Sequence, residues 1–300
     1  MIFSKILRAF VGGFSEAVGG AIGQIVESTQ VVYYGVAEKL KPTPSKSHYT
    51  FNLRDISKIF QGVCSSDQKA TQQAVDIVRI WIHENQRVFG DRMINEEDKG
   101  VLLELLLTES EKFGLKKDVI FNVERLIFGD YFNGIDGEQR PYLQIEDIAG
   151  LLTKIAEYLE DFNSGSKQAM ELVMFLDACD HTSRICRVLR QPQGNALLLG
   201  VGGSGRQSLT KLATFMNNYK LYQIEVVKGY NMTNWRDNLK FCLMQAGVEA
   251  KITTFLFVDT QIINEQMLED INNVLNSGDV PQLYKTEDLE GIFNVGKQEC

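Results

Sequence analysis

The sequence predicts an α/β protein in which a helical first half is followed by an incomplete parallel sheet with flanking helices. Three observations carry this prediction. Residues 1–190 consist mostly of amphipathic stretches at helical spacing, an apolar run at 196–199 leads into a glycine-rich turn and another helical pattern, and a second apolar run at 254–258 ends in Asp259. Strands that alternate with helices in this way are typical of a parallel sheet.

The first 62 residues are expected to be helical on both sides of a linker. Residues 1–40 have helical character, although five glycines between positions 12 and 23 weaken it. Its first ten residues are amphipathic, and the early acid Glu16 favours a packed helix over the alternative of a mitochondrial transit peptide. Residues 41–47 contain two prolines and form the linker, after which Asn52 is placed to cap a helix that ends at Gly62.

Further helical patterns follow up to Pro192. They cover residues 71–89, two stretches within 96–128, residues 145–162 and residues 167–190. Between them, residues 129–138 alternate acids with glycines, but the spacing is not that of a calcium-binding EF-hand loop. We therefore expect a solvated loop there.

From Asn195 onward the pattern changes to alternating strands and helices. We predict strands at 196–199, 222–225 and 254–258, and helices at 209–216, 234–246 and 266–276. The helix over 234–246 has Thr233 as its expected cap and Gly247 at its end, and Trp235 is expected in the core. Residues 285–300 offer one short apolar run, 291–295.

The turn after the first strand follows the pattern of a phosphate-binding loop, G-x-x-x-x-G-K-[ST]. Glycines let the backbone aim its N–H groups at phosphate oxygens, and the following helix N-terminus adds its dipole. Two positions depart from the pattern: Arg206 replaces the lysine, and Gln207 replaces the hydroxyl residue that binds Mg²⁺, with Ser208 one position late as a substitute. The predicted nucleotide-binding residues of the loop are Gly200, Gly202, Gly203, Ser204, Gly205, Arg206, Gln207 and Ser208.

Asp259 is the predicted metal ligand, because its carboxylate follows a buried strand and is placed to hold Mg²⁺ directly or through water. In ATPases of the AAA+ type the next residue is a glutamate that polarises the attacking water. Here it is Thr260, and a hydroxyl is a poor base near neutral pH. The sequence therefore predicts a loop that binds nucleotide but hydrolyses it poorly.

Composition excludes several classes of protein. The chain has 31 basic and 39 acidic residues, a net charge of −8, which is not the footprint of a nucleic-acid-binding protein. We also expect no membrane association, because no apolar run approaches the roughly 18 residues of a span.

The five cysteines contain no C-x-x-C pair. Cys179 and Cys186, near His181, are expected to pack in a core rather than hold a metal, and reduced cysteines fit the cytoplasm.

Several segments resemble one family closely. The loop Gly200-Val-Gly-Gly-Ser-Gly-Arg-Gln-Ser-Leu-Thr210, the segment Phe255-Leu-Phe-Val-Asp-Thr-Gln-Ile262 and the segment Gly278-Asp-Val-Pro-Gln-Leu-Tyr284 resemble the fourth AAA+ module of axonemal dynein heavy chains, most of all the inner-arm type. Residues 47–62 resemble the C-terminal lid of the third module, and residues 170–195 resemble the lead-in to the fourth.

The resemblance implies a division into two domains: a helical lid of the third module at residues 1–140, and the N-terminal part of the fourth module at 141–300. It implies ATP or ADP with Mg²⁺ as ligands. The implied partners are the remaining AAA+ modules, with intermediate and light chains through the full complex and microtubules only through the full-length motor. It implies a place in the cytoplasm and cytoskeleton, at the axoneme of a cilium or flagellum. Because such heavy chains are many times longer, the sequence is expected to be a fragment.

The resemblance also suggests a role for Arg54. A helical arginine in AAA+ lids often reaches the γ-phosphate, a role called sensor II, for which a bidentate guanidinium is suited. The alternative is a surface ion pair with Asp55 or another acid.

Two other functions remain open. An autonomous P-loop ATPase or kinase would need a general base, and Glu225 and Glu265 are the nearest acids to the loop in the predicted sheet. An inert scaffold fragment would bind no nucleotide.

Overall fold

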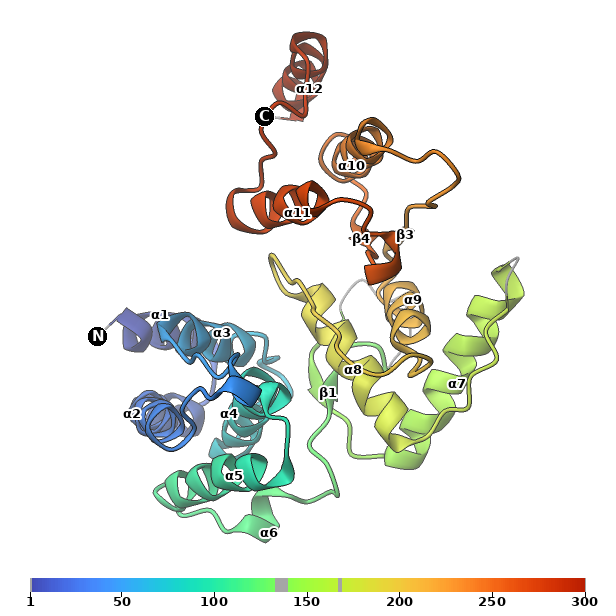
Figure 1. Ribbon diagram of the computed structural model, residues 1–300. Helices are drawn as coiled ribbons and strands as arrows, with labels where there is room; N and C mark the ends of the chain where they lie inside the picture. The colour runs from blue at the N-terminus through green and yellow to red at the C-terminus, as the bar shows by residue number, and fades with distance from the viewer. Residues whose placement is uncertain (1, 133–139, 167–168, 300) are drawn as a thin grey trace. The chain divides into compact units, whose positions relative to one another are not determined.

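The computed structural model describes residues 2–132, 140–166 and 169–299, and its chain divides into two compact units, residues 1–151 and 152–300 (Figure 1). The first unit is helical with one short hairpin. The second has helices around a short parallel sheet. The α/β class predicted from the sequence is therefore confirmed.

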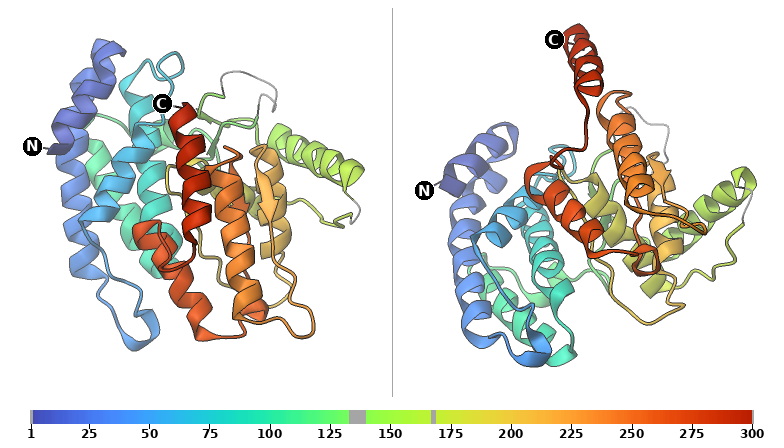
Figure 2. Two further views of the ribbon diagram at one scale, coloured as in Figure 1. Left: turned by 90° about the horizontal axis from the view of Figure 1, so that it is seen from above. Right: turned by 45° about the horizontal axis from the view of Figure 1, so that its top comes forward.

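The first unit is built mainly from helices. Its helices are α1 (Ile2–Phe10), α2 (Glu16–Lys39), α3 (Leu53–Val63), α4 (Ala74–Val88), α5 (Glu96–Glu111) and α6 (Lys117–Ile120), with 3-10 turns at Val11–Gly13, Pro44–Lys46 and Gly90–Arg92. Helices α2, α3, α4 and α5 lie side by side, as two further views show (Figure 2). Strands β1 (Phe128–Gly129) and β2 (Leu143–Gln144) pair antiparallel. Most of the loop predicted at 129–138 lies outside the described residues.

Polar caps start these helices where the sequence indicated. Asn52 accepts hydrogen bonds from the N-terminal turn of α3 and forms a reciprocal capping box with Asp55, which confirms the predicted cap. The stretch predicted as helix over 1–40 is two helices instead. It breaks at Gly12–Gly13, and Ser15 caps the second helix by accepting a hydrogen bond from Val18 N–H at 3.3 Å.

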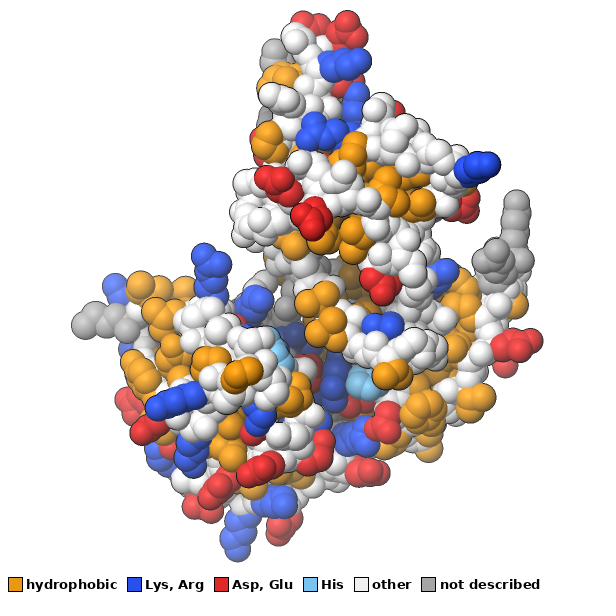
Figure 3. Space-filling view, in the orientation of Figure 1, with side chains coloured by type: hydrophobic (Ala, Val, Ile, Leu, Met, Phe, Trp, Pro, Cys, Tyr) orange, Lys and Arg blue, Asp and Glu red, His pale blue; other side chains and the backbone are white. Residues whose placement is uncertain are grey.

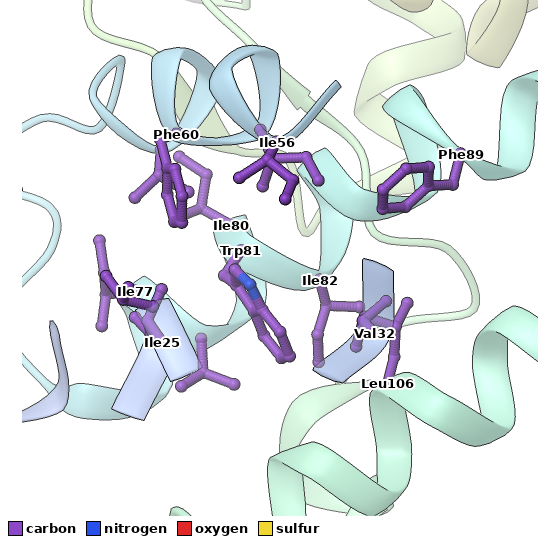
Figure 4. Packing of buried hydrophobic residues seen from close by; sticks show 14 of the residues in the cluster. Ile25, Val32, Ile56, Phe60, Ile77, Ile80, Trp81, Ile82, Phe89 and Leu106 are labelled. Carbon is purple, nitrogen blue, oxygen red and sulfur yellow. The ribbon is translucent and has the colours of Figure 1, made fainter. Parts of the chain in front are cut away.

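The core of the first unit lies between α2, α3, α4 and α5 (Figure 4). Trp81 of α4 is completely buried, and its indole N–H donates to Thr29 Oγ1 of α2 at 2.8 Å. The Thr29 hydroxyl in turn donates to the Ile25 carbonyl. Because the one polar atom of the tryptophan is satisfied, its whole ring adds to the apolar core without leaving a buried donor unpaired.

Helices α3 and α4 approach closely at Gly62. A Cβ atom at that position would lie 1.8 Å from Oε2 of Glu84 in α4. Glu84 is itself fully buried, and Tyr142 O–H donates to its Oε1 at 3.4 Å. The carboxylate thus occupies the space that any side chain at position 62 would need.

The second unit places helices on a two-stranded parallel sheet. Strand β3 (Lys220–Tyr222) pairs with β4 (Thr253–Phe255), with Lys220 opposite Thr253. Its helices are α7 (Ile148–Gly165, which begins before the division at 151), α8 (Leu176–Arg190), α9 (Arg206–Met216), α10 (Met232–Gly247), α11 (Glu265–Ser277) and α12 (Thr286–Glu299), and a 3-10 turn covers Asp259–Gln261. Helix α12 occupies the stretch in which the sequence offered only a short apolar run.

The prediction of a buried, paired strand at 196–199 is wrong. This segment has no strand partner among the described residues, and Leu197 and Leu199 are each 83% exposed. An apolar run predicts the extended backbone, but a strand also needs a neighbour to accept its hydrogen bonds. The sheet strands also differ from prediction: β3 ends at Tyr222, where the second predicted strand was expected to begin, and β4 ends at Phe255, three residues before the predicted end.

Two helix starts also differ from prediction. The helix predicted over 167–190 begins at Leu176, because Asn163 at the end of α7 exchanges two hydrogen bonds with the Met170 backbone and holds that segment extended. Asn231, not Thr233, caps α10, and its side chain accepts from the N–H groups of both Thr233 and Asn234.

One apolar cluster of the second unit centres on Trp235 of α10, which is completely buried as predicted. Its indole N–H donates to Asp270 of α11 at 2.9 Å, and the same carboxylate forms an ion pair with Arg236. Apolar side chains remain at the surface over α10 and α11, among them Phe241, Leu268 and Leu275 (Figure 3). Across the described ranges, we find no helix with the length and apolar character that crossing a bilayer requires.

Candidate phosphate-binding site

The loop from Gly200 to Gly205 has the backbone that its glycines predict. Gly203 and Gly205 adopt left-handed conformations, with φ of 78° and 77°, a region that residues with a Cβ atom rarely enter. Ser204 N–H donates to the Val201 carbonyl at 3.3 Å and closes a turn between them. The left-handed residue Gly205 then leads directly into α9.

Helix α9 starts without a side-chain cap. Its first intrahelical hydrogen bond runs from Leu209 N–H to the Gly205 carbonyl at 2.8 Å. The N–H groups of residues 206–208 therefore have no acceptor within the helix. Such groups, together with the helix dipole, favour an anion at this end of α9.

Arg206 folds back over the loop that it follows. Its Nη2 donates to the Val201 carbonyl at 3.1 Å. A Cβ atom at Gly200 would lie 3.2 Å from Ser204 Oγ and 3.5 Å from Arg206 Cδ, so Gly200 leaves room for this packing. The guanidinium thus lies against the loop, and it carries further N–H donors besides the one that bonds to Val201.

The ends of β3 and β4 meet at one edge of the sheet. Leu256 N–H, one residue past β4, donates to the carbonyl of Tyr222, the last residue of β3, at 2.8 Å. Next to it, buried Gln261 donates from Nε2 to the Ile224 carbonyl at 2.6 Å, while its Oε1 accepts from Val258 N–H. Gln261 therefore fixes the turn containing Asp259 against the segment that follows β3.

Sequence reasoning assigned no role to Gln261. Its amide lies in a turn directly after an apolar strand, where a buried polar side chain needs backbone partners. The sequence shows a polar residue, Gln261, two positions after Asp259. It does not show that the side chain bonds to the carbonyl of Ile224, which lies 37 residues earlier in the chain.

A second contact brings the loop helix to the same edge. Gln207 Oε1 accepts a long hydrogen bond of 3.5 Å from Gln223 Nε2, and Gln223 directly follows β3. Through Gln223, Ile224 and Gln261, the N-terminus of α9 is connected to the turn at Asp259. These contacts place the start of α9 and the turn that contains Asp259 at the segment that follows β3.

The residues at this edge do not fit a directly ligated Mg²⁺ ion. Asp259 is exposed, and its Oδ1 accepts the Thr260 N–H at 3.0 Å. The residue that would supply the second oxygen ligand is Gln207, whose amide oxygen is turned to Gln223. Asp259 therefore remains a candidate to contact such an ion through water.

Glu225, Glu265 and Arg54 make no contact that would serve catalysis within the described residues. Glu225 and Glu265 are both exposed in the second unit, and Glu265 begins α11. Arg54 is exposed at the start of α3 in the first unit. The Asp55 carboxylate, considered as its alternative partner, forms an ion pair with Arg92 at 2.9 Å.

The cysteines of α8 are core residues, as predicted. Cys179 is fully buried and Cys186 is 2% exposed, whereas His181 between them is exposed. Burial raises the pKa of the Cys179 thiol to about 11, which disfavours the thiolate that a metal or an electrophile would need. No group of three His, Cys, Asp or Glu side chains suited to a metal ion occurs in the part of the chain that the structure describes.

Comparison with protein families gives two matches. Residues 170–300 match a family described as the P-loop containing dynein motor region D4. Residues 25–124 match the AAA+ lid domain.

Curated relatives cover nearly the whole chain. Dynein axonemal heavy chain 1 of Mus musculus is 44% identical over 306 residues, 98% of this chain. Dynein axonemal heavy chain 6 of Homo sapiens is 44% identical over 97% of the chain, and dynein axonemal heavy chain 3 of Mus musculus is 45% identical over 96%. The chain spans 7% of the length of each of these relatives.

Proposed function

The chain is homologous over almost its whole length to axonemal dynein heavy chains, and on this premise we propose that it is a segment of a dynein motor ring that binds ATP or ADP at a degenerate phosphate loop. The observation that carries the proposal is the left-handed loop at Gly203 and Gly205 opening into the uncapped helix α9. Both features favour a phosphate group.

We assign the helical first part to the lid of the third AAA+ module and the second part to the nucleotide-binding core of the fourth. The lid family matches within the first unit, and the D4 family matches within the second. In this assignment Arg54 is the sensor II arginine of the third module, because it is exposed near the N-terminus of a lid helix.

The nucleotide would be held and turned over slowly. The proposed contacts come from the N–H groups at the start of α9, from Arg206 and from the loop Gly200, Gly202, Gly203, Ser204 and Gly205, with Gln207 and Ser208 at the first turn of the helix. Thr260 replaces the acid that would polarise water, so we propose a regulatory or structural role rather than force generation. Neither Glu225 nor Glu265 has a contact that favours an autonomous ATPase.

The proposed setting is the complete heavy chain. Its other AAA+ modules would be the direct partners, and the intermediate chains, the light chains and the microtubule would be reached only through the full motor complex. The curated relatives are named as axonemal. We accordingly place the function in the axoneme of a cilium or flagellum.

Fluorescent nucleotide binding tests the proposal. The chain should bind mant-ATP and mant-ADP saturably. Arg206→Ala should weaken binding by roughly 1.5–3 kcal/mol, as for a lost charged hydrogen bond, which is about ten- to a hundredfold. Arg206→Lys should recover part of the affinity. Lys211→Ala removes the same charge farther along α9 and should leave affinity unchanged. A folded wild-type chain that binds neither nucleotide would favour the inert scaffold.

A further inference from the structure

The residues of the proposed nucleotide site determine whether it needs a metal ion. In phosphate loops of this pattern, the hydroxyl after the lysine binds Mg²⁺ while the ion bridges phosphate oxygens. Mg²⁺ demands near-ideal octahedral geometry with hard oxygen ligands at short distance. A loop that lacks a correctly placed oxygen therefore gains little from the ion.

Gln207 does not supply that oxygen. A serine or threonine hydroxyl is attached to Cβ, whereas the glutamine amide oxygen lies two carbon atoms farther from the backbone. In the structure this oxygen accepts the amide of Gln223, so it points to the end of β3. To reach an ion beside the phosphates, the Gln207 side chain would have to break its hydrogen bond with Gln223 and fold back toward the loop.

Ser208 does not replace it either. Gln207 and Ser208 are consecutive residues of α9, and side chains one residue apart on a helix point about 100° away from each other. The hydroxyl of Ser208 is therefore directed around the helix from the position that the pattern assigns to the ligand.

Arg206 and the start of α9 supply positive charge beside the loop. The guanidinium is always charged and carries five N–H donors, of which one bonds to the Val201 carbonyl. The uncapped first turn of α9 adds the N–H groups of residues 206–208. Together they can neutralise phosphate oxygens without a cation.

From this placement we infer that the loop binds the phosphates of a nucleotide through Arg206 and the N-terminus of α9, and that Mg²⁺ is dispensable for affinity. The inference rests on the proposed function, because it presupposes that the loop binds nucleotide. The reason that Mg²⁺ adds little to nucleotide affinity is the replacement of the hydroxyl residue by Gln207.

The test compares mant-ADP titrations of the folded chain in excess Mg²⁺ and in excess EDTA. The dissociation constant should change by less than about tenfold between the two conditions. A loss of about tenfold or more in EDTA would overturn the inference while leaving the proposed function standing. Absence of binding in both conditions would instead contradict the proposed function and remove the premise.

Two variants locate the effect. Gln207→Thr restores the hydroxyl and should make binding about tenfold or more tighter in Mg²⁺ than in EDTA. Gln223→Ala frees the Gln207 oxygen but adds no hydroxyl. Because that oxygen still lies two carbon atoms farther from the backbone than a hydroxyl, binding should remain independent of the metal. If Gln207→Thr melts like the wild type and still binds mant-ADP equally well in Mg²⁺ and in EDTA, Gln207 is not the reason for the metal independence.

Discussion

At the scale of single residues, Thr260 decides what the proposed site does with a bound nucleotide. Its backbone N–H donates to Asp259 Oδ1, and its side chain is exposed beside that carboxylate. A hydroxyl at this position does not position water as a carboxylate does.

Thr260→Glu should therefore raise hydrolysis only slightly in this chain and more strongly in a complete motor. An arginine from a neighbouring module, worth about 10³–10⁵ in rate in other P-loop enzymes, would be missing from the isolated chain. Single-turnover hydrolysis should be measured with Thr260 and with Thr260→Glu. Each is tested in the chain alone and in a full motor whose other hydrolytic sites are disabled. Fast turnover by the unaltered chain alone would contradict the non-catalytic role.

Asp98 is a second residue whose chemistry the structure defines. Its buried carboxylate accepts hydrogen bonds from Lys46 Nζ at 2.6 Å and from Tyr49 O–H at 2.7 Å. Burial opposes its ionisation, but the hydrogen bonds from Lys46 and Tyr49 outweigh burial, and the pKa of Asp98 lies below the ordinary value. The cluster joins the loop before α3 to the first turn of α5.

Asp98→Asn should lower the melting temperature at pH 7, and the gap to wild type should close in acid. Because the folded-state pKa is the lower one, the carboxylate stabilises the fold above the unfolded-state pKa of about 3.9. That contribution is lost as the pH falls through the folded-state pKa. Thermal unfolding from pH 7 to pH 3 measures the gap. Glu96→Gln, in an exposed pair on the same helix, should show no such gap, and a gap for Asp98→Asn that persists in acid would contradict the assignment.

At the scale of elements, the start of α9 depends on one left-handed residue. Gly205 has φ of 77°, and a Cβ atom there would meet no other atom within 4 Å. Any cost of a side chain at this position is therefore backbone strain rather than a clash.

Gly205→Ala should lower the free energy of unfolding by about 1–2 kcal/mol, the cost of a left-handed residue with a Cβ atom. Gly202→Ala is the matched control, since its Cβ atom would also meet nothing and its φ is not in the left-handed range. Denaturant unfolding of the two variants measures the difference. Equal stabilities would mean that the loop relaxes away from the left-handed conformation.

The elements also separate what the sequence predicts from what it does not. The cap of α3 at Asn52 and the glycine turn before α9 were predictable, because caps and turns depend on residues close in the chain. The pairing of 196–199 was not, since a strand partner is set by distant contacts. Within the candidate site, the loop and Asp259 were found from their motifs, whereas the Gln207–Gln223 and Gln261–Ile224 contacts join segments that no local pattern connects.

At the scale of the whole molecule, the two tryptophans lie in apolar clusters of different size. The buried cluster that contains Trp81 extends from Leu7 to Tyr142, while the cluster that contains Trp235 has few buried members. The chain has two tryptophans, each fully buried and one in each unit.

Tryptophan fluorescence should therefore report two unfolding transitions. In urea, the signal of Trp235 should change at lower concentration than that of Trp81, because less apolar surface is buried around it. Trp81→Phe and Trp235→Phe isolate each signal, and circular dichroism of the unaltered chain controls for the substitutions. ADP should shift the Trp235 transition alone, since a ligand stabilises the unit that binds it. A single coincident transition would contradict this independence.

The contact between Gly62 and Glu84 has a consequence for evolution. Because the glutamate carboxylate fills the place of a Cβ atom at position 62, a side chain there and a glutamate at 84 exclude each other in this geometry. Gly62 therefore cannot be replaced by a residue with a side chain unless Glu84 is first, or at the same time, replaced by a smaller residue. In an alignment of related lids the two positions should covary, with alanine or larger at the first accompanied by a smaller residue at the second.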